Sequence, residues 1–324
     1  MPTPSDANAI RIIRIYDAPV AMVWDAFADP TQAAQWWGPR GFTLTTHSKD
    51  LRPGGSWDYT MHGPDGTDYP NFARYLEVEP QARMVYDHGA TSADAAPMFR
   101  VTALFRDLGG RTELDLTMTL PTAEAAQQTR VFVKAAGGNG TWDRLAEYLE
   151  KTARAQEIFV INRSFDAPLA RVFDMWTTPE HLAAWLPPAG FTMVFQHADI
   201  RTGGDATFSL TNGDFSMYLR HQYLDVSRPD RLVYTQTFID AQGNASRQPG
   251  APTWPVTTRS TVVFAEEGPG VTRVTVRFDV DGEVTSEELA AFVAERGGMT
   301  QGWSGSFDTL EAVVADAETA LAKR

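Results

Sequence analysis

The feature that most constrains this chain is a long internal repeat. The stretch DAPVAMVWDAFADPTQAAQWWGPRGFT (Asp17–Thr43) returns as DAPLARVFDMWTTPEHLAAWLPPAGFT (Asp166–Thr192). Later segments repeat in the same order, among them DLRPGGSWDYTM with DIRTGGDATFSL and RYLEVEPQARMVY with QYLDVSRPDRLVY. A repeat unit this long and internally complete predicts tandem domains and not a solenoid. We therefore expect one domain over residues 1–154 and a second over residues 155–324.

Composition supports two packed domains and excludes several function classes. Each copy is long enough for its own core, and 43% hydrophobic with 11% aromatic residues is typical of globular chains. No cysteine is present, so disulfides and thiolate chemistry are excluded. With no apolar run of about 18–20 residues and no signal peptide, we expect a cytoplasmic protein without membrane insertion. The net charge of −13 offers no basic face for nucleic acid or an anionic membrane.

The hydrophobic pattern predicts the same order of elements in each copy. AIRIIRIY alternates as a strand does, and two short helices beginning near Pro19 and Pro30 follow it. Six strands separated by turn residues come next, and then a helix over about residues 123–153, interrupted at GGNG. This order predicts an α+β fold, in which an antiparallel sheet curves around a long C-terminal helix. The space between that helix and the sheet is the expected functional site.

Strand alternation selects the side chains that face this space. In SWDYTM a period of two places Trp57, Tyr59 and Met61 on one face, whereas Asp58 lies on the other. We applied the same alternation to the other strands of both copies and added one ring, that of Trp37, from the end of the second helix. The predicted ligand-binding residues are Trp37, Trp57, Tyr59, Met61, Tyr86, His88, Phe208, Leu210, Tyr234 and Gln236. Each apolar member could equally fill a core. The polar members need a hydrogen-bonding partner, because an unpaired buried polar group costs about 1–3 kcal/mol.

The candidate reactive residues are few. None of the six histidines has the spacing of a zinc site, so we expect neither a metal nor a cofactor. His88 lies two residues from Tyr86 and could act as an acid/base group, orient a ligand carbonyl or simply form a structural hydrogen bond. The glycine clusters GGNG and RGGMTQGWSG lack the lysine and the strand–loop–helix order of phosphate loops. We interpret them as points where the long helix passes close to the sheet.

The two copies diverge at one wall position. Ala206 occupies the place of Trp57, and the second copy also carries the insertion DAQGNASRQPGAPTWP. Loss of a large ring predicts a second cavity that is wider at this level, unless the insertion folds in to fill it. The two cavities should then not be equivalent sites.

The motifs APVAMVWDAFADPTQAAQWWGP, RPGGSWDY, GPDGTDYP, YLEVEPQARMVY and GTWDRLAEYL resemble bacterial homologues of the activator of heat-shock protein 90 ATPase. That family belongs to the START-like (SRPBCC) helix-grip superfamily, and the resemblance covers nearly all of both copies. It implies tandem helix-grip domains whose cavities bind small apolar or amphipathic molecules. Two alternatives stay open: a cofactor-independent enzyme of the cyclase or dehydratase type, and a chaperone-ATPase-activator-like module with a protein partner.

Overall fold

The computed structural model of this chain describes residues 7–90, 92–135, 140–153 and 158–322. The chain divides into two compact units, Met1–Ala153 and Arg154–Arg324. The predicted boundary after residue 154 falls in the segment 154–157, which lies outside the described residues.

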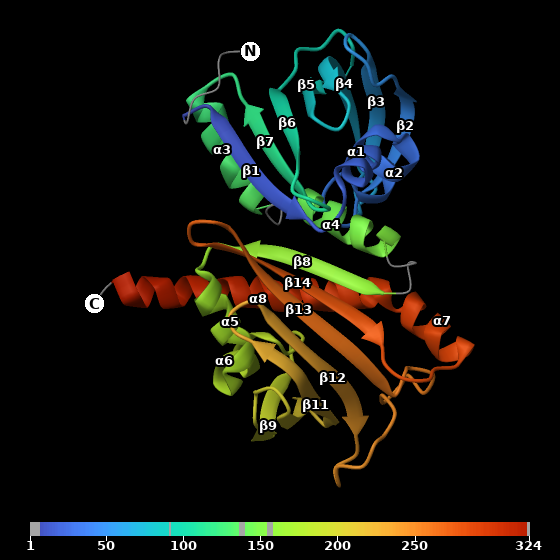
Figure 1. The fold of residues 1–324 in the computed structure, drawn as a ribbon, viewed down its shortest axis with the longest axis vertical. Coiled ribbons are helices and arrows are strands. Elements are labelled where there is room, and N and C mark those ends of the chain that lie inside the picture. Colours follow the sequence, from blue (N-terminus) through green and yellow to red (C-terminus); the bar gives the residue numbers. More distant parts are fainter. Residues whose placement is uncertain (1–6, 91, 136–139, 154–157, 323–324) are drawn as a thin grey trace. The chain divides into compact units, whose positions relative to one another are not determined.

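The first domain follows the predicted order of strand, two short helices and six strands (Figure 1). Its elements are β1 (Ala9–Tyr16), α1 (Val20–Ala28), α2 (Pro30–Trp36), β2 (Thr43–Lys49), β3 (Ser56–His62), β4 (Asp68–Glu79), β5 (Arg83–Ala90), β6 (Phe99–Asp107), β7 (Thr112–Thr119), α3 (Ala123–Ala135) and α4 (Gly140–Ala153). The expected C-terminal helix is thus described as two helices. Most of the GGNG segment between them, residues 137–139, lies outside the described residues.

The second domain repeats this order. Its elements are β8 (Phe159–Phe165), α5 (Leu169–Thr177), α6 (Pro179–Trp185), β9 (Thr192–Ala198), β10 (Asp205–Asn212), β11 (Phe215–Ser227), β12 (Arg231–Ile239), β13 (Thr257–Gly268), β14 (Val271–Val280), α7 (Ser286–Ala294) and α8 (Arg296–Ala322). A capping box formed by Thr285 and Glu288 starts α7, and Glu295 is the residue between α7 and α8.

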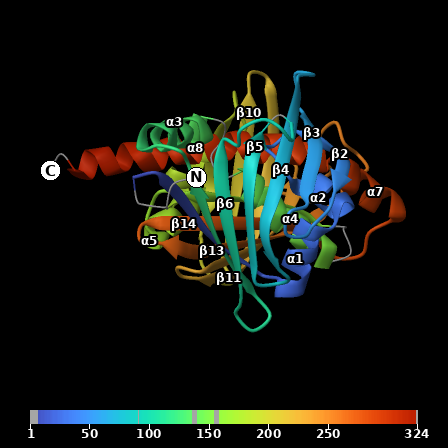
Figure 2. The same ribbon diagram turned by 90° about the horizontal axis from the view of Figure 1, so that it is seen from above.

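Each domain contains one antiparallel seven-stranded sheet. The strand orders are β1-β7-β6-β5-β4-β3-β2 and β8-β14-β13-β12-β11-β10-β9, so the first strand of each domain pairs with the last. Figure 2 shows β6, β5, β4, β3 and β2 side by side in this order. The buried residues of each domain form one core, to which the sheet, the two short helices and the last helix contribute. The predicted α+β helix-grip architecture is confirmed.

Two repeated glycines explain the shared RPGG and RTGG motifs. A Cβ atom at Gly55 would lie 2.1 Å from the carbonyl oxygen of Asp50, and one at Gly204 would lie 2.1 Å from that of Asp199. No real side chain tolerates such a distance, so only glycine fits where the chain turns into β3 or β10. The turns fix the register of these strands, which carry the predicted cavity walls.

Burial along these strands alternates as expected. Trp57 and Tyr59 are buried, whereas Asp58 between them is exposed. In the second domain Ala206 and Phe208 are buried in the same way. The inner faces of β3 and β10 are therefore the ones that the sequence pattern indicates.

Candidate functional site: a cavity in the second domain

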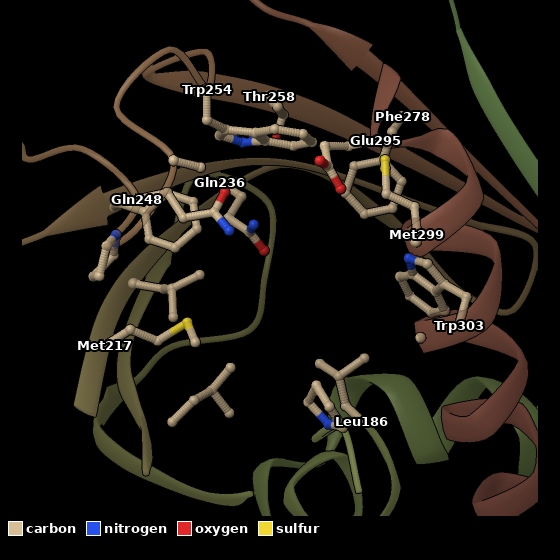
Figure 3. A pocket seen from close by; sticks show the side chains of 18 of the residues that line it. Leu186, Met217, Gln236, Gln248, Trp254, Thr258, Phe278, Glu295, Met299 and Trp303 are labelled. Carbon is tan, nitrogen blue, oxygen red and sulfur yellow. The ribbon is translucent and has the colours of Figure 1, made fainter. Parts of the chain in front are cut away.

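A partly open cavity of about 580 Å³ lies between the sheet of the second domain and α8 (Figure 3). Strands β10, β11 and β12 supply one wall, with Phe208, Met217 and Tyr234 among its side chains. The opposite wall is one face of α8, which carries Met299 and Trp303. The loop between β12 and β13 supplies further lining residues. The cavity thus lies where a helix-grip fold leaves room between its helix and its sheet.

Four predicted site residues line this cavity: Phe208, Leu210, Tyr234 and Gln236. The lining residues from α8 and from the inserted loop, which include Trp254, Met299 and Trp303, were not among the predicted site residues. Helical spacing could have predicted the lining residues of α8. The lining positions 295, 298, 299, 302, 303 and 306 follow the three- and four-residue steps of one helix face. The inserted loop had no such signal, since its path depends on the surrounding sheet.

The glycines of α8 do not mark a close approach to the sheet. A Cβ atom at Gly297, Gly302 or Gly305 would meet no other atom within 4 Å. The interpretation of RGGMTQGWSG as a point of tight helix–sheet contact is therefore wrong. Gly298 and Gly302 line the cavity instead, and their missing side chains leave space in it.

A buried histidine orients the amide of Gln236. The Nε2 atom of His221 lies 3.0 Å from Oε1 of Gln236, and His221 is only 2% exposed. Burial lowers the pKa of His221 to about 4, so its ring is neutral at neutral pH. The ring N–H then donates to the amide oxygen, which leaves the amide N–H groups of Gln236 for the cavity (Figure 3).

The large ring missing at Ala206 is replaced from the neighbouring strand. Ala206 is paired with His221 across β10 and β11, whereas Trp57 is paired with Ala73 across β3 and β4. The ring centres of His221 and Tyr234 lie 4.3 Å apart. The expected widening at Ala206 is thus offset by His221, and Ala206 itself is not a lining residue.

In the first domain the predicted site residues gather into a packed aromatic cluster. The centre of the Trp57 ring lies 4.2 Å from the ring centre of Tyr59 and 5.0 Å from that of Trp37. None of these three residues is more than 8% exposed. Tyr86 is also buried in this core, and Met61 packs against it. Side chains thus pack together here at the level where the second domain has its cavity.

A chain of hydrogen bonds crosses this cluster. Trp37 Nε1 donates to the hydroxyl of Tyr59 over 3.0 Å, and that hydroxyl lies 2.6 Å from Nε2 of His88. The tryptophan can only donate, so the hydroxyl oxygen of Tyr59 accepts from it, whereas the direction of the hydrogen bond between Tyr59 and His88 depends on the tautomer of the histidine. Burial lowers the pKa of His88 to about 4 and raises the pKa of Tyr59 and Tyr86, so all three are neutral at neutral pH. The Nδ1 atom of His88 is buried without a hydrogen-bond partner among the described residues, so the acid/base, ligand-orienting and structural roles of His88 all stay predictions.

Lys49 covers the outer edge of the cluster. Its Nζ atom lies 3.8 Å from the centre of the Trp57 ring and donates to the carbonyl oxygen of Phe27 over 2.5 Å. Burial lowers the pKa of Lys49 to about 7. The indole N–H of Trp57 donates to Thr46 over 3.1 Å. Trp57 is therefore in contact on several sides.

The described residues contain neither a candidate metal site nor a membrane-spanning helix. No group of three or more histidine, aspartate or glutamate side chains in this part of the chain could hold a metal ion. No helix within the described ranges is both long and apolar enough to cross a membrane.

Several solved structures resemble one domain of this chain. A protein from Nitrosomonas europaea is 20% identical with a TM-score of 0.43, covering 46% of this chain and 99% of its own. A protein from Arthrobacter aurescens is 25% identical with a TM-score of 0.42, covering 48% and 92%. The di-domain ARO/CYC protein BexL is similar over both domains, with 13% identity, a TM-score of 0.40 and coverage of 94% and 98%.

No curated protein matches the chain. A family model does match it, once in each domain, over residues 17–150 and 166–315. These two ranges take in most of the chain and include the repeated motifs with which the sequence analysis began. The chain therefore belongs to the family described as Activator of Hsp90 ATPase homolog 1-like protein.

Proposed function

We propose that the second domain binds a small, largely apolar molecule in its cavity. The observation that carries this proposal is the cavity itself, whose volume of about 580 Å³ suits a small organic ligand. Its walls are mainly aromatic rings, leucines and methionines, among them Phe208, Trp254 and Trp303. A ligand would gain about 25 cal/mol for each Å² of apolar surface that it buries there.

A few polar groups would orient the ligand. The N–H groups of Gln236, held by His221, can donate to a carbonyl or hydroxyl oxygen of the ligand. Thr258 is paired with Gln236 across β12 and β13 and also lines the cavity. A mostly apolar wall with a few fixed polar groups is what a selective small-molecule site requires.

The proposal assigns unequal roles to the two domains. The site residues in the second domain are Phe208, Leu210, Tyr234 and Gln236, joined by residues of α8 and of the inserted loop. The corresponding set in the first domain, Trp37, Trp57, Tyr59, Met61, Tyr86 and His88, serves mainly to pack that domain.

The small-molecule binding known for the START-like superfamily supports this proposal. A cyclase- or dehydratase-like enzyme would use the same cavity, and turnover of a bound molecule would distinguish it from a binding protein. The family description also keeps a chaperone-ATPase activator as an alternative.

A glycine on the cavity face of α8 allows a sharp test. Gly302→Leu places a side chain into open space in the cavity, whereas Gly305→Leu makes the same change on α8 outside the set of lining residues. Neither change should harm folding, because replacing a helical glycine favours the helix by up to about 1 kcal/mol. Phenylnaphthylamine, a neutral apolar dye that brightens when buried, serves as the probe.

We expect the parent and Gly305→Leu to bind the dye alike, and Gly302→Leu to bind it at least about tenfold more weakly, since the lost volume excludes one ring. Thermal unfolding of each variant checks that its fold is intact. Failure of the parent to bind the dye, or equal binding by the two leucine variants, would contradict the proposed site.

A further inference from the structure

One side chain gives the cavity a charge. Among the described residues that line it, Glu295 is the only one with an ionisable acidic or basic group, apart from the phenol of Tyr234. Burial raises the pKa of Tyr234 to about 12, so the phenol is neutral at neutral pH. Glu295 lies between α7 and α8, and its residue is exposed.

No basic side chain balances this carboxylate within the described part of the chain. Arg247, from the inserted loop, pairs with Glu288 at 2.5 Å and also donates to the carbonyl oxygen of Trp254. Arg296, the next residue after Glu295, donates to the carbonyl oxygens of Val293 and Ile158. Glu295 itself takes part in no ion pair among these residues. Its charge is thus left for the cavity.

Aromatic rings stand on both sides of the carboxylate. Figure 3 shows its oxygens directed into the cavity, between Trp254 on one side and Phe278 and Trp303 on the other. Trp254 packs on Phe292 with ring centres 5.5 Å apart, and Phe278 packs on Trp303 at 5.7 Å. These contacts hold the rings in place. The faces of aromatic rings carry partial negative charge, so they favour a cation as the carboxylate does.

We infer that the ligand of this cavity is an amphipathic organic cation. Its apolar body would occupy the space between β10–β12 and α8, and its ammonium group would lie beside Glu295 between the rings of Trp254, Phe278 and Trp303. The carboxylate of Glu295 would repel a carboxylate or phosphate in the same position, and no cationic side chain among the described lining residues offsets that repulsion. This inference rests on the proposed binding function and adds the charge class of the ligand.

Three probes with one apolar body test the inference: phenylbutylamine, phenylbutanol and phenylbutyrate. They differ in a cationic, a neutral and an anionic end group. For the full chain we expect phenylbutylamine to bind about three- to tenfold more tightly than phenylbutanol, and phenylbutyrate to bind most weakly. The preference for the cation should shrink as salt is added, since Glu295 is exposed.

The variant Glu295→Gln keeps the shape and removes the charge. This variant should bind phenylbutylamine only as tightly as phenylbutanol, and its affinity for phenylbutanol should equal that of the parent. The control Glu311→Gln removes an exposed charge on α8 outside the set of lining residues, and it should preserve the preference. Calorimetric titration measures all affinities, and thermal unfolding shows whether either change affects the fold.

The outcomes separate this inference from the proposed function. If the alcohol binds but the amine has no advantage, or if Glu295→Gln lowers stability and leaves the preference intact, the cavity binds ligands but the charge assignment is wrong. If none of the three probes binds and phenylnaphthylamine does not bind either, the proposed function itself fails.

Discussion

Replacing Trp57 with alanine tests whether the first domain has a filled core at the level of the cavity in the second. The residue is 3% exposed and contacts the rings of Trp37 and Tyr59. A side chain that bordered an empty site would lose few contacts when shortened. A side chain packed among aromatic rings should lose many, and the first domain should be strongly destabilised.

The expected magnitude follows from the contacts of the ring. A buried aromatic side chain removes about 150–250 Å² from water, which corresponds to roughly 4–6 kcal/mol as an upper estimate. Measured losses for such truncations are about 3–5 kcal/mol. At a pH below the lowered pKa of Lys49, about 7, its contact at 3.8 Å adds a cation–π contribution of about 0.5–1 kcal/mol. We expect Trp57→Ala to lower the free energy of unfolding of the first domain by about 4 kcal/mol.

Hydrogen exchange of the full chain, followed by mass spectrometry of peptides, measures this change domain by domain. Peptides from β3 and β5 report on the first domain, and peptides from β10 and β12 are an internal control. The matched variant Trp57→Phe keeps a ring and should lose less than half as much stability. A loss below about 1 kcal/mol for Trp57→Ala would refute the reasoning and restore Trp57 as a cavity wall.

A second substitution probes the same packing from the opposite strand. Ala73→His in the Trp57→Ala background copies the Ala206–His221 pair of the second domain. It should recover part of the lost stability, because the imidazole occupies space left by the indole. A further loss would show that a histidine on the neighbouring strand does not replace the missing ring.

Two predictions concern pH. Because His221 has a pKa of about 4 in the folded protein against an ordinary 6.5, the unfolded chain binds more protons between these values. The stability of the second domain should therefore fall as the pH drops from 6.5 to 4, and His221→Gln should lessen that fall in exchange experiments on β11 and β12; an unchanged fall would contradict the assignment. Lys49 has a pKa of about 7 against an ordinary 10.5, so the first domain should gain stability as the pH rises through this range. Lys49→Met should remove the gain, and a persisting gain would mean that another group causes it.

The repeat, the strand alternation and the turn glycines were sufficient to predict the architecture. These signals are local, since a period of two or a glycine with no room for a Cβ acts within a few residues. Repetition of the same signals in two copies made the α+β fold and its order of elements predictable, and the family resemblance added the helix-grip assignment. The inward faces of β3 and β10 followed from the same alternation.

Tertiary structure alone decided where the open space lies. Alternation placed Trp57 and Ala206 on inner faces, but it did not show that His221, across the strand pair from Ala206, supplies the large ring that Trp57 supplies opposite Ala73. The path of the inserted loop brings Trp254 to the cavity, and the break between α7 and α8 brings Glu295 to the same wall. These contacts join residues far apart in the chain, so no local sequence pattern encodes them. Packing volume is a property of the assembled core, so strand alternation alone does not predict it.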